Sequence, residues 1–212
     1  MAMLLVLSLT VTTLAAGTDA AASIDLTAER QSDRLTINVC LSAEKATNGR
    51  LVVKYDAETL ALVDYSDVNV GLASVNTEKN GEVSFAWVGS NITDSVEVLT
   101  LVFQYKNHGE TNSIFTGTVV ELYSNGTDLL GDKTLEDTVT AEAILPGDLD
   151  DDGKLEIREV IDLLKALASK SVKDFNWLQA IAADVNGDGK INTRDAIAAL
   201  QAIAAYNPAA AK

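Results

Sequence analysis

The stretch DLDDDGKLEIRE, from Asp148 to Glu159, decides the fold of the C-terminal part of the chain, and it recurs as DVNGDGKINTRD from Asp184 to Asp195. Both copies place oxygen-bearing side chains at positions 1, 3 and 5, glycine at position 6 and a carboxylate at position 12. A hard cation takes about six to eight oxygen ligands, and glycine permits the sharp turn that gathers them, so this order is typical of a calcium-binding loop. Two copies in register disfavour the simpler interpretation, an acidic surface turn.

The spacing assigns the ligands in both loops. At position 7 the ligand is a main-chain carbonyl. Position 8 is apolar, Leu155 or Ile191, and anchors the loop to a core, whereas Glu156 and Asn192 at position 9 are expected to act through a water. We expect two Ca²⁺ ions, held by Asp148, Asp150, Asp152, the Lys154 carbonyl and Glu159 in loop 1 and by Asp184, Asn186, Asp188, the Lys190 carbonyl and Asp195 in loop 2.

Helical periodicity follows each loop, because apolar residues recur at helical spacing in the stretches 160–167 and 196–203. The segment before loop 1 is different, since Pro146 and Gly147 oppose a helix there. An ordinary EF-hand has an entering helix as well as an exiting one. The sequence therefore predicts a small all-α module of two repeats, each a loop with an exiting helix. The missing entering helix counts against a calcium sensor, one alternative function.

This duplicated unit resembles a dockerin module of type I, as found in cellulosome-type assemblies, through the stretches GDLDDDGKLE at 147–156 and ADVNGDGKIN at 183–192. The resemblance spans 145–206 and implies that the partner is a cohesin. It also implies that loop positions 10 and 11 and the following helix make the contacts, through Ile157, Arg158, Leu164 and Lys165 in the first repeat and Thr193, Arg194, Leu200 and Gln201 in the second. Core packing stays an alternative for the two leucines, and simple solvation for the two arginines.

Composition limits the function of the whole chain. With 212 residues and 47% hydrophobic content, the chain is long enough for two domains. Its net charge of −15 disfavours nucleic acid and anionic membrane as partners, because both attract clustered lysine and arginine. Cys40 is the only cysteine, so an intramolecular disulfide cannot form. It alternates with apolar residues in the run 35–41, and we interpret it as a small structural residue.

Residues 1–22 read as a secretory signal, with an apolar run over 3–16 and small residues at Ala20 and Ala22, although the usual positive n-region is missing. The run is too short to count as a membrane span. We expect a secreted, extracellular or cell-surface protein, and a buried first strand is the alternative for this segment. Residues 207–212 are expected to form a tail.

The stretch 23–144 has a β pattern. Short alternating runs are separated by turn residues, and they lie at 35–41, 51–55, 83–88, 98–105, 115–123 and 139–143. Many short strands separated by turns favour a sandwich or a barrel.

A second resemblance lies in this β region. The stretches 49–63, 81–90 and 99–105 are similar to the cohesin fold, in which a strand ending in Tyr-Asp runs into a short Leu-containing turn and a Gly-led strand follows later. The resemblance implies a jelly-roll β-sandwich whose dockerin-facing surface includes the strand entered at Asn48 and Arg50. Asn48 matches a polar contact position, whereas Arg50 stands where an acidic residue is common, which alters the usual partner preference.

Catalysis has no support in the sequence, since the only histidine, His108, lies in a turn and offers no Ser/His/Asp arrangement. We expect a non-catalytic adaptor of the scaffoldin type, whose calcium-dependent dockerin module binds a cohesin and whose cohesin-like sandwich receives a dockerin-bearing protein. Polysaccharide would be reached indirectly, and the chain itself would be monomeric. The alternative is a carbohydrate-binding sandwich anchored to a scaffold by its dockerin. A row of exposed aromatic residues on one sheet would favour that alternative.

Overall fold

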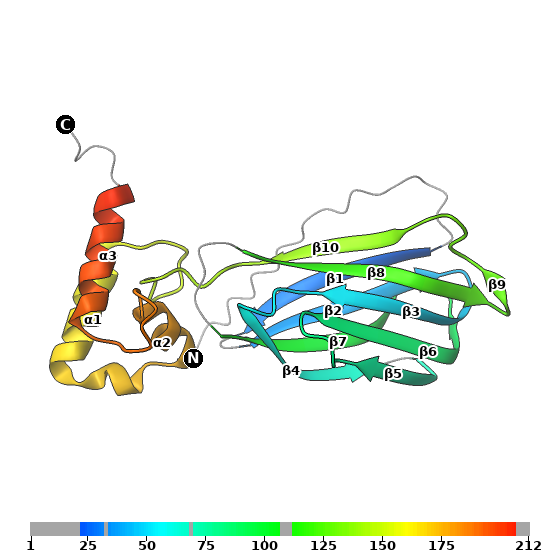
Figure 1. Cartoon of the computed structure of the whole chain (residues 1–212), viewed down its shortest axis with the longest axis horizontal. Coiled ribbons are helices and arrows are strands. Elements are labelled where there is room, and N and C mark those ends of the chain that lie inside the picture. Colours follow the sequence, from blue (N-terminus) through cyan, green and yellow to red (C-terminus); the bar gives the residue numbers. More distant parts are fainter. Residues whose placement is uncertain (1–21, 32–33, 68–69, 107–111, 207–212) are drawn as a thin grey trace. The chain divides into compact units, whose positions relative to one another are not determined.

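The computed structural model describes residues 22–31, 34–67, 70–106 and 112–206. The chain divides into a β unit, which ends at Ala141, and a helical unit that contains Glu142–Lys212 together with Lys106–Asn112 (Figure 1). The expected signal segment, apart from Ala22, lies outside the described residues, as do His108 and the expected tail. Within the described ranges, no helix is long and apolar enough to cross a membrane.

The β unit is a sandwich of two antiparallel sheets, as predicted (Figure 1). The smaller sheet has the strand order β1 (Ala22–Gln31), β2 (Arg34–Ala43), β7 (Val96–Tyr105) and β4 (Leu60–Asp67). The larger sheet has the order β10 (Leu135–Ala141), β8 (Ser113–Ser124), β3 (Ala46–Lys54), β6 (Glu82–Ile92) and β5 (Leu72–Asn76), and β9 (Thr127–Asp128) pairs with β8.

Alternation along the strands builds the core between the sheets. In β2, buried and half-buried residues alternate, so Cys40 lies on the face opposite Ile37 and Val39, as expected. An aromatic group fills the centre, with the Phe103 and Phe115 rings 5.0 Å apart. Trp87, which lies in the alternating run 83–88, is 3% exposed and is a core residue.

Strand β1 closes one side of the sandwich. It pairs with β2 along its whole length, and its Leu26 N–H donates a hydrogen bond of 2.7 Å to Asp137 Oδ2 on β10. Gly117 on β8 makes this approach possible, because a Cβ there would lie 2.6 Å from Leu26 Cδ1. The two sheets are therefore joined at the β1–β10 side.

Four strands were missed by sequence reasoning, namely β1, β4, β5 and the two-residue β9. A turn follows Tyr-Asp as expected and is closed by the hydrogen bond from Leu60 N–H to the Asp56 carbonyl at 3.0 Å, but Leu60 itself already begins β4. Strand β4 lacks alternation, since its second half is exposed, and β5 has only five residues. The last strand ends at Ala141 and begins at Leu135, earlier than the predicted 139–143.

The helical unit contains α1 (Ile157–Ser169), the 3₁₀ turn η1 (Ser171–Asp174), α2 (Trp177–Ala183) and α3 (Thr193–Tyr206). The exiting helices α1 and α3 were predicted. The simple loop-and-helix repeat is wrong in one respect, because α2 directly precedes loop 2 and ends at Ala183. A capping box starts α2, in which the Asn176 side chain accepts from Gln179 N–H at 2.8 Å and Gln179 Oε1 accepts from Asn176 N–H at 3.1 Å.

The core of this unit is small and formed by both repeats. Its buried residues are Val160, Leu163, Ala183, Ala196 and Ala199, and Leu155 and Ile191 pack against them. The position 8 residues therefore anchor the two loops to the core, as expected.

Candidate calcium loops and docking faces

Loop 1 gathers its first three ligand residues. One carboxylate oxygen from each of Asp148, Asp150 and Asp152 lies within 4.8 Å of the other two. The chain is turned back by hydrogen bonds from Gly153 N–H to Asp148 Oδ2, 2.8 Å, and from Asp152 N–H to Asp148 Oδ1, 3.2 Å. Gly153 has a φ of 80°, so this position needs the left-handed conformation that glycine adopts without strain.

Loop 2 repeats the same hydrogen bonds. Gly189 N–H donates to Asp184 Oδ2 at 2.8 Å and Asp188 N–H donates to Asp184 Oδ1 at 3.1 Å. Gly189 has a φ of 77°, close to that of its counterpart in loop 1. At position 4, Gly187 has a φ of 69° and Asp151 in loop 1 has a φ of 61°. The two loops thus have the same backbone conformation at their turns.

The carboxylates at position 12 are buried and reach back into their loops. Glu159 is 5% exposed, and its Oε2 accepts from Glu156 N–H at 2.7 Å. Asp195 is 0% exposed, and its two oxygens accept from Asn186 N–H at 3.2 Å and from Asn192 N–H at 2.8 Å. Both helices therefore place a carboxylate where the twelfth loop residue closes a cation site.

Electrostatics fit a cation in loop 1. Burial raises the pKa of the Asp148 carboxyl above its usual value, hydrogen bonds from the Gly153, Asp152 and Asp151 backbone N–H groups oppose this, and the Asp151 charge adds to the rise. The donors assigned to both loops are all oxygen atoms, the kind that Ca²⁺ and other hard cations prefer. The residues present therefore suit calcium, with loop 1 and loop 2 each offering one site.

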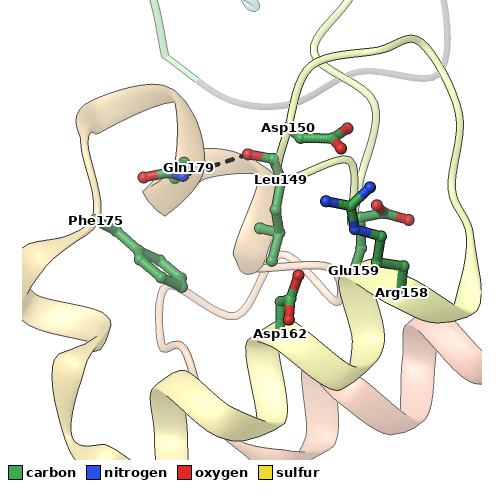
Figure 2. A pocket seen from close by; sticks show the side chains of 7 residues that line it. All are labelled: Leu149, Asp150, Arg158, Glu159, Asp162, Phe175 and Gln179. Carbon is green, nitrogen blue, oxygen red and sulfur yellow. Dashed lines mark hydrogen bonds between the residues drawn. The ribbon is translucent and has the colours of Figure 1, made fainter.

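A cavity of about 150 Å³ lies between loop 1, α1 and α2 (Figure 2). Its apolar wall comes from Leu149 and Phe175, and the Gln179 side chain donates to the Leu149 carbonyl at 3.4 Å. Arg158 lines the same cavity as the ligand residues Asp150 and Glu159. Arg158 therefore lies directly beside the candidate cation site of loop 1.

The eight predicted partner-binding residues of the helical unit are all exposed. Leu164 and Leu200 are both 43% exposed, whereas their neighbours Leu163 and Ala199 face the core. Core packing, the alternative for the two leucines, is therefore wrong. Arg158 and Arg194 are exposed, and each lies at the start of its helix.

Asn48 and Arg50 lie on the outer face of the larger sheet, because the intervening Gly49 faces inward against Trp87. Asn48 is the cross-strand neighbour of Val88, and Val88 is that of Leu72, which are 52% and 76% exposed. These four residues form what we call the outer-sheet face. Arg50 Nη2 makes an ion pair of 2.9 Å with Glu121 Oε1 on β8, so its charge is balanced locally.

No family model matches the chain, and no curated protein matches it. Cohesin modules are among the solved structures similar to this chain. A cohesin module from a family 33 glycoside hydrolase of Clostridium perfringens shares 10% identity, covers 58% of this chain and 98% of its own, and has a TM-score of 0.43. A non-cellulosomal cohesin from the archaeon Archaeoglobus fulgidus shares 14% identity, covers 58% of this chain and 93% of its own, and has a TM-score of 0.42. A cohesin from Acetivibrio cellulolyticus, solved in complex with a dockerin, shares 10% identity, covers 57% of this chain and 99% of its own, and has a TM-score of 0.45.

Sequence reasoning missed two residues of the helical faces. Ile161 and Ile197 are 46% and 54% exposed, and each precedes the exposed leucine of its helix by three residues. They hold equivalent places in the two repeats, so the repeat alignment combined with the i, i+3 spacing would have found them. Each exiting helix therefore presents an isoleucine and a leucine beside a basic residue at its start.

Proposed function

We propose that the chain is a non-catalytic extracellular adaptor with two interaction modules. The helical unit is a dockerin that takes two Ca²⁺ ions and docks into a cohesin. The sandwich is a cohesin-like domain that receives a dockerin-bearing protein. The equivalence of the two repeats carries this proposal, since both loops tie position 1 to the position 6 amide and both helices expose an isoleucine and a leucine at matching places.

The exposed faces support docking rather than a purely structural role. An isoleucine and a leucine exposed at the same places in both repeats favour a contact with another protein, because exposed apolar patches mark such contacts. The basic residues Arg158 and Arg194 beside these pairs favour an acidic partner surface, because charge complementarity steers association and sets specificity.

The outer-sheet face supports the second half of the proposal. Leu72 and Val88 offer an apolar strip, and Asn48 offers polar groups at its end. Since Arg50 is already paired with Glu121, an incoming basic side chain meets a balanced pair rather than a lone cation.

Carbohydrate binding is the weaker candidate. Flat sugar-binding faces depend on exposed aromatic rings. Among the described residues of the sandwich, Tyr65 is the only exposed aromatic residue, at 46% exposed, and the others are buried or half-buried. Trp87 is in the core. A row of exposed aromatics, which would favour this alternative, is not found in the described part of either sheet.

The test combines calcium titration with partner binding. Calorimetric titration of the full chain should give two sites, and Asp148→Ala and Asp184→Ala should each remove one of them. The full chain should then bind purified cohesins through its helical unit and purified dockerins through its sandwich, the former only with calcium. Two unchanged sites in either variant would contradict the ligand assignment, and failure to bind any member of both panels would contradict the adaptor function.

A further inference from the structure

The two calcium loops differ strongly in charge although their backbones match. Loop 1 carries six acidic residues and two basic ones, and loop 2 carries three acidic and two basic, so their net charges are −4 and −1. The difference arises at positions 3, 4 and 9, where Asp150, Asp151 and Glu156 correspond to Asn186, Gly187 and Asn192. Among the assigned ligands, loop 1 has four carboxylates and loop 2 has three, and the charge of the ligand set is one of the main determinants of calcium affinity in such loops.

The closing carboxylates differ as well. Glu159 uses one oxygen, Oε2, for the hydrogen bond from Glu156 N–H, and within the described helical unit its Oε1 accepts no hydrogen bond. Both oxygens of Asp195 accept backbone N–H groups of loop 2, and the aspartate side chain is one methylene shorter. Loop 1 therefore holds a carboxylate oxygen ready for a cation, whereas loop 2 must share both of its oxygens.

Burial adds to this difference. In loop 1 both the first and the last ligand are buried, Asp148 at 6% and Glu159 at 5% exposed. In loop 2 only Asp195 is buried, and Asp184 is half-buried. Buried carboxylates without a counter-charge are costly, so a cation relieves more electrostatic free energy in loop 1.

We propose that the two loops fill in order, loop 1 at lower calcium than loop 2. This inference rests on the proposed calcium-dependent function and deepens it. Between the two steps, loop 1 and α1 are fixed while loop 2 and the start of α3 are not. The face made by Arg158, Ile161 and Leu164 is then available over a range of calcium in which its counterpart on α3 is not, so calcium sets how many docking faces the module presents.

The order can be followed at two equivalent atoms. The amides of Gly153 and Gly189 donate the same 2.8 Å hydrogen bonds in their loops, so each reports the filling of its own site. The full chain, labelled with ¹⁵N-glycine, has 13 glycine signals to resolve. During titration from chelator into calcium, we expect the Gly153 signal to reach its midpoint at about tenfold or more lower free calcium than the Gly189 signal.

Two variants test the cause. Asn186→Asp with Gly187→Asp brings loop 2 to a charge of −3, and Asp151 shows that aspartate adopts this backbone conformation at the equivalent position. The Gly189 midpoint should move toward that of Gly153 by at least about threefold. Asp150→Asn with Asp151→Gly should move the Gly153 midpoint to higher free calcium, toward that of Gly189. Asp174→Asn, which removes one charge outside both loops, should leave the separation unchanged.

Each result is decisive. Coincident midpoints, an earlier Gly189 step, or an unchanged separation in both loop double variants would overturn the ordered filling while leaving the calcium function intact. If neither signal responds to calcium, the proposed calcium function fails instead. A misfolded variant would be recognised by the loss of dispersion of the other glycine signals, and the reciprocal variant then decides the question.

Discussion

At the scale of single residues, Gly49 shows how little space the sandwich leaves. A Cβ at this position would lie 2.6 Å from Trp87 Cη2 and 2.7 Å from the Glu121 carbonyl oxygen. The Trp87 ring also stacks on Phe85 at a centroid distance of 5.5 Å. The glycine therefore lets the indole approach the backbone of β3 closely.

Gly49→Ala should destabilise the sandwich by about 1–3 kcal/mol, the usual range for overpacking a tight core. Adding Trp87→Phe should make the effect of the alanine smaller, because the two indole atoms that clash are absent from phenylalanine, although the Glu121 carbonyl still crowds the site. Denaturant unfolding measures both effects. Ser74→Ala on exposed β5 is the control, with a change within about 0.5 kcal/mol, and an additive double variant would refute the proposed clash.

Cys40 is expected to be a poor nucleophile. Partial burial raises the pKa of its thiol, and the Glu97 and Asp25 charges raise it further. Since only the thiolate is alkylated, the folded protein should react with iodoacetamide more slowly than the unfolded chain at mildly alkaline pH. Glu97→Gln should increase the folded rate by removing one of the two charges. Equal rates in folded and unfolded protein would show that the site does not suppress the thiolate.

At the scale of elements, the sequence predicted best what repetition and alternation encode. The loops and the two exiting helices follow from the spacing of the ligands and of the apolar residues, and the central strands follow from their alternation. Helix α2 was missed because it has only seven residues, although its Asn176–Gln179 capping box is visible in the sequence. The outer-sheet face was predicted only in part, since exposure of Leu72 depends on the pairing of β5 with β6, which no local pattern specifies.

The matching faces of α1 and α3 lead to a prediction about partner binding. At saturating calcium, a cohesin should bind either face after the module rotates by about half a turn, because the two faces are related by the repeat. Arg158→Asp alone and Arg194→Asp alone should therefore leave affinity largely intact, and the double variant should lose at least about tenfold. Surface-immobilised cohesin can measure this.

Lys173→Asp in η1 makes the same charge change away from both faces and serves as the control. Complete loss of binding from one single substitution would mean that a single orientation is used.

At the scale of the whole molecule, the fold of the sandwich and the fold of the helical unit are stabilised by different forces. The sandwich has a large aromatic and aliphatic core, whereas the core cluster of the helical unit has five buried residues, of which three are alanine. Each candidate calcium loop also contains at least three carboxylates. We therefore expect the helical unit to depend on a cation for stability far more than the sandwich does.

Chelation should unfold the helical unit and leave the sandwich intact. Without a cation, carboxylate repulsion acts against a small core, so the far-ultraviolet helical signal should fall and calcium should restore it. The thermal transition of the sandwich should stay at the same temperature, as measured through the near-ultraviolet signal of Trp87 in a Trp177→Phe background, since Trp177 lies in α2. Full helicity in excess chelator would contradict this dependence.

The chain should be monomeric in calcium. Residues 23–145 carry a net charge of −11 and residues 146–212 carry −3, which two Ca²⁺ ions raise to +1. This allows a weak long-range attraction between the units of different chains, but screening over about 8 Å leaves local contacts to decide. Light scattering at rising protein concentration should give a constant mass, and calcium-dependent growth into dimers or chains would show self-recognition.

The larger sheet protects its two edges unequally, which has a consequence for aggregation. At β10 the Asp137 carboxylate ties down β1, so that edge is covered. At the other edge, among the described strands, β5 has no neighbour beyond it and carries Leu72 at 76% exposed. An open edge is a template for pairing with another chain, and natural proteins limit the hazard by keeping such strands short. With five residues, β5 follows that rule. Because this edge is the open one, edge-to-edge association of crowded sandwiches would begin at β5.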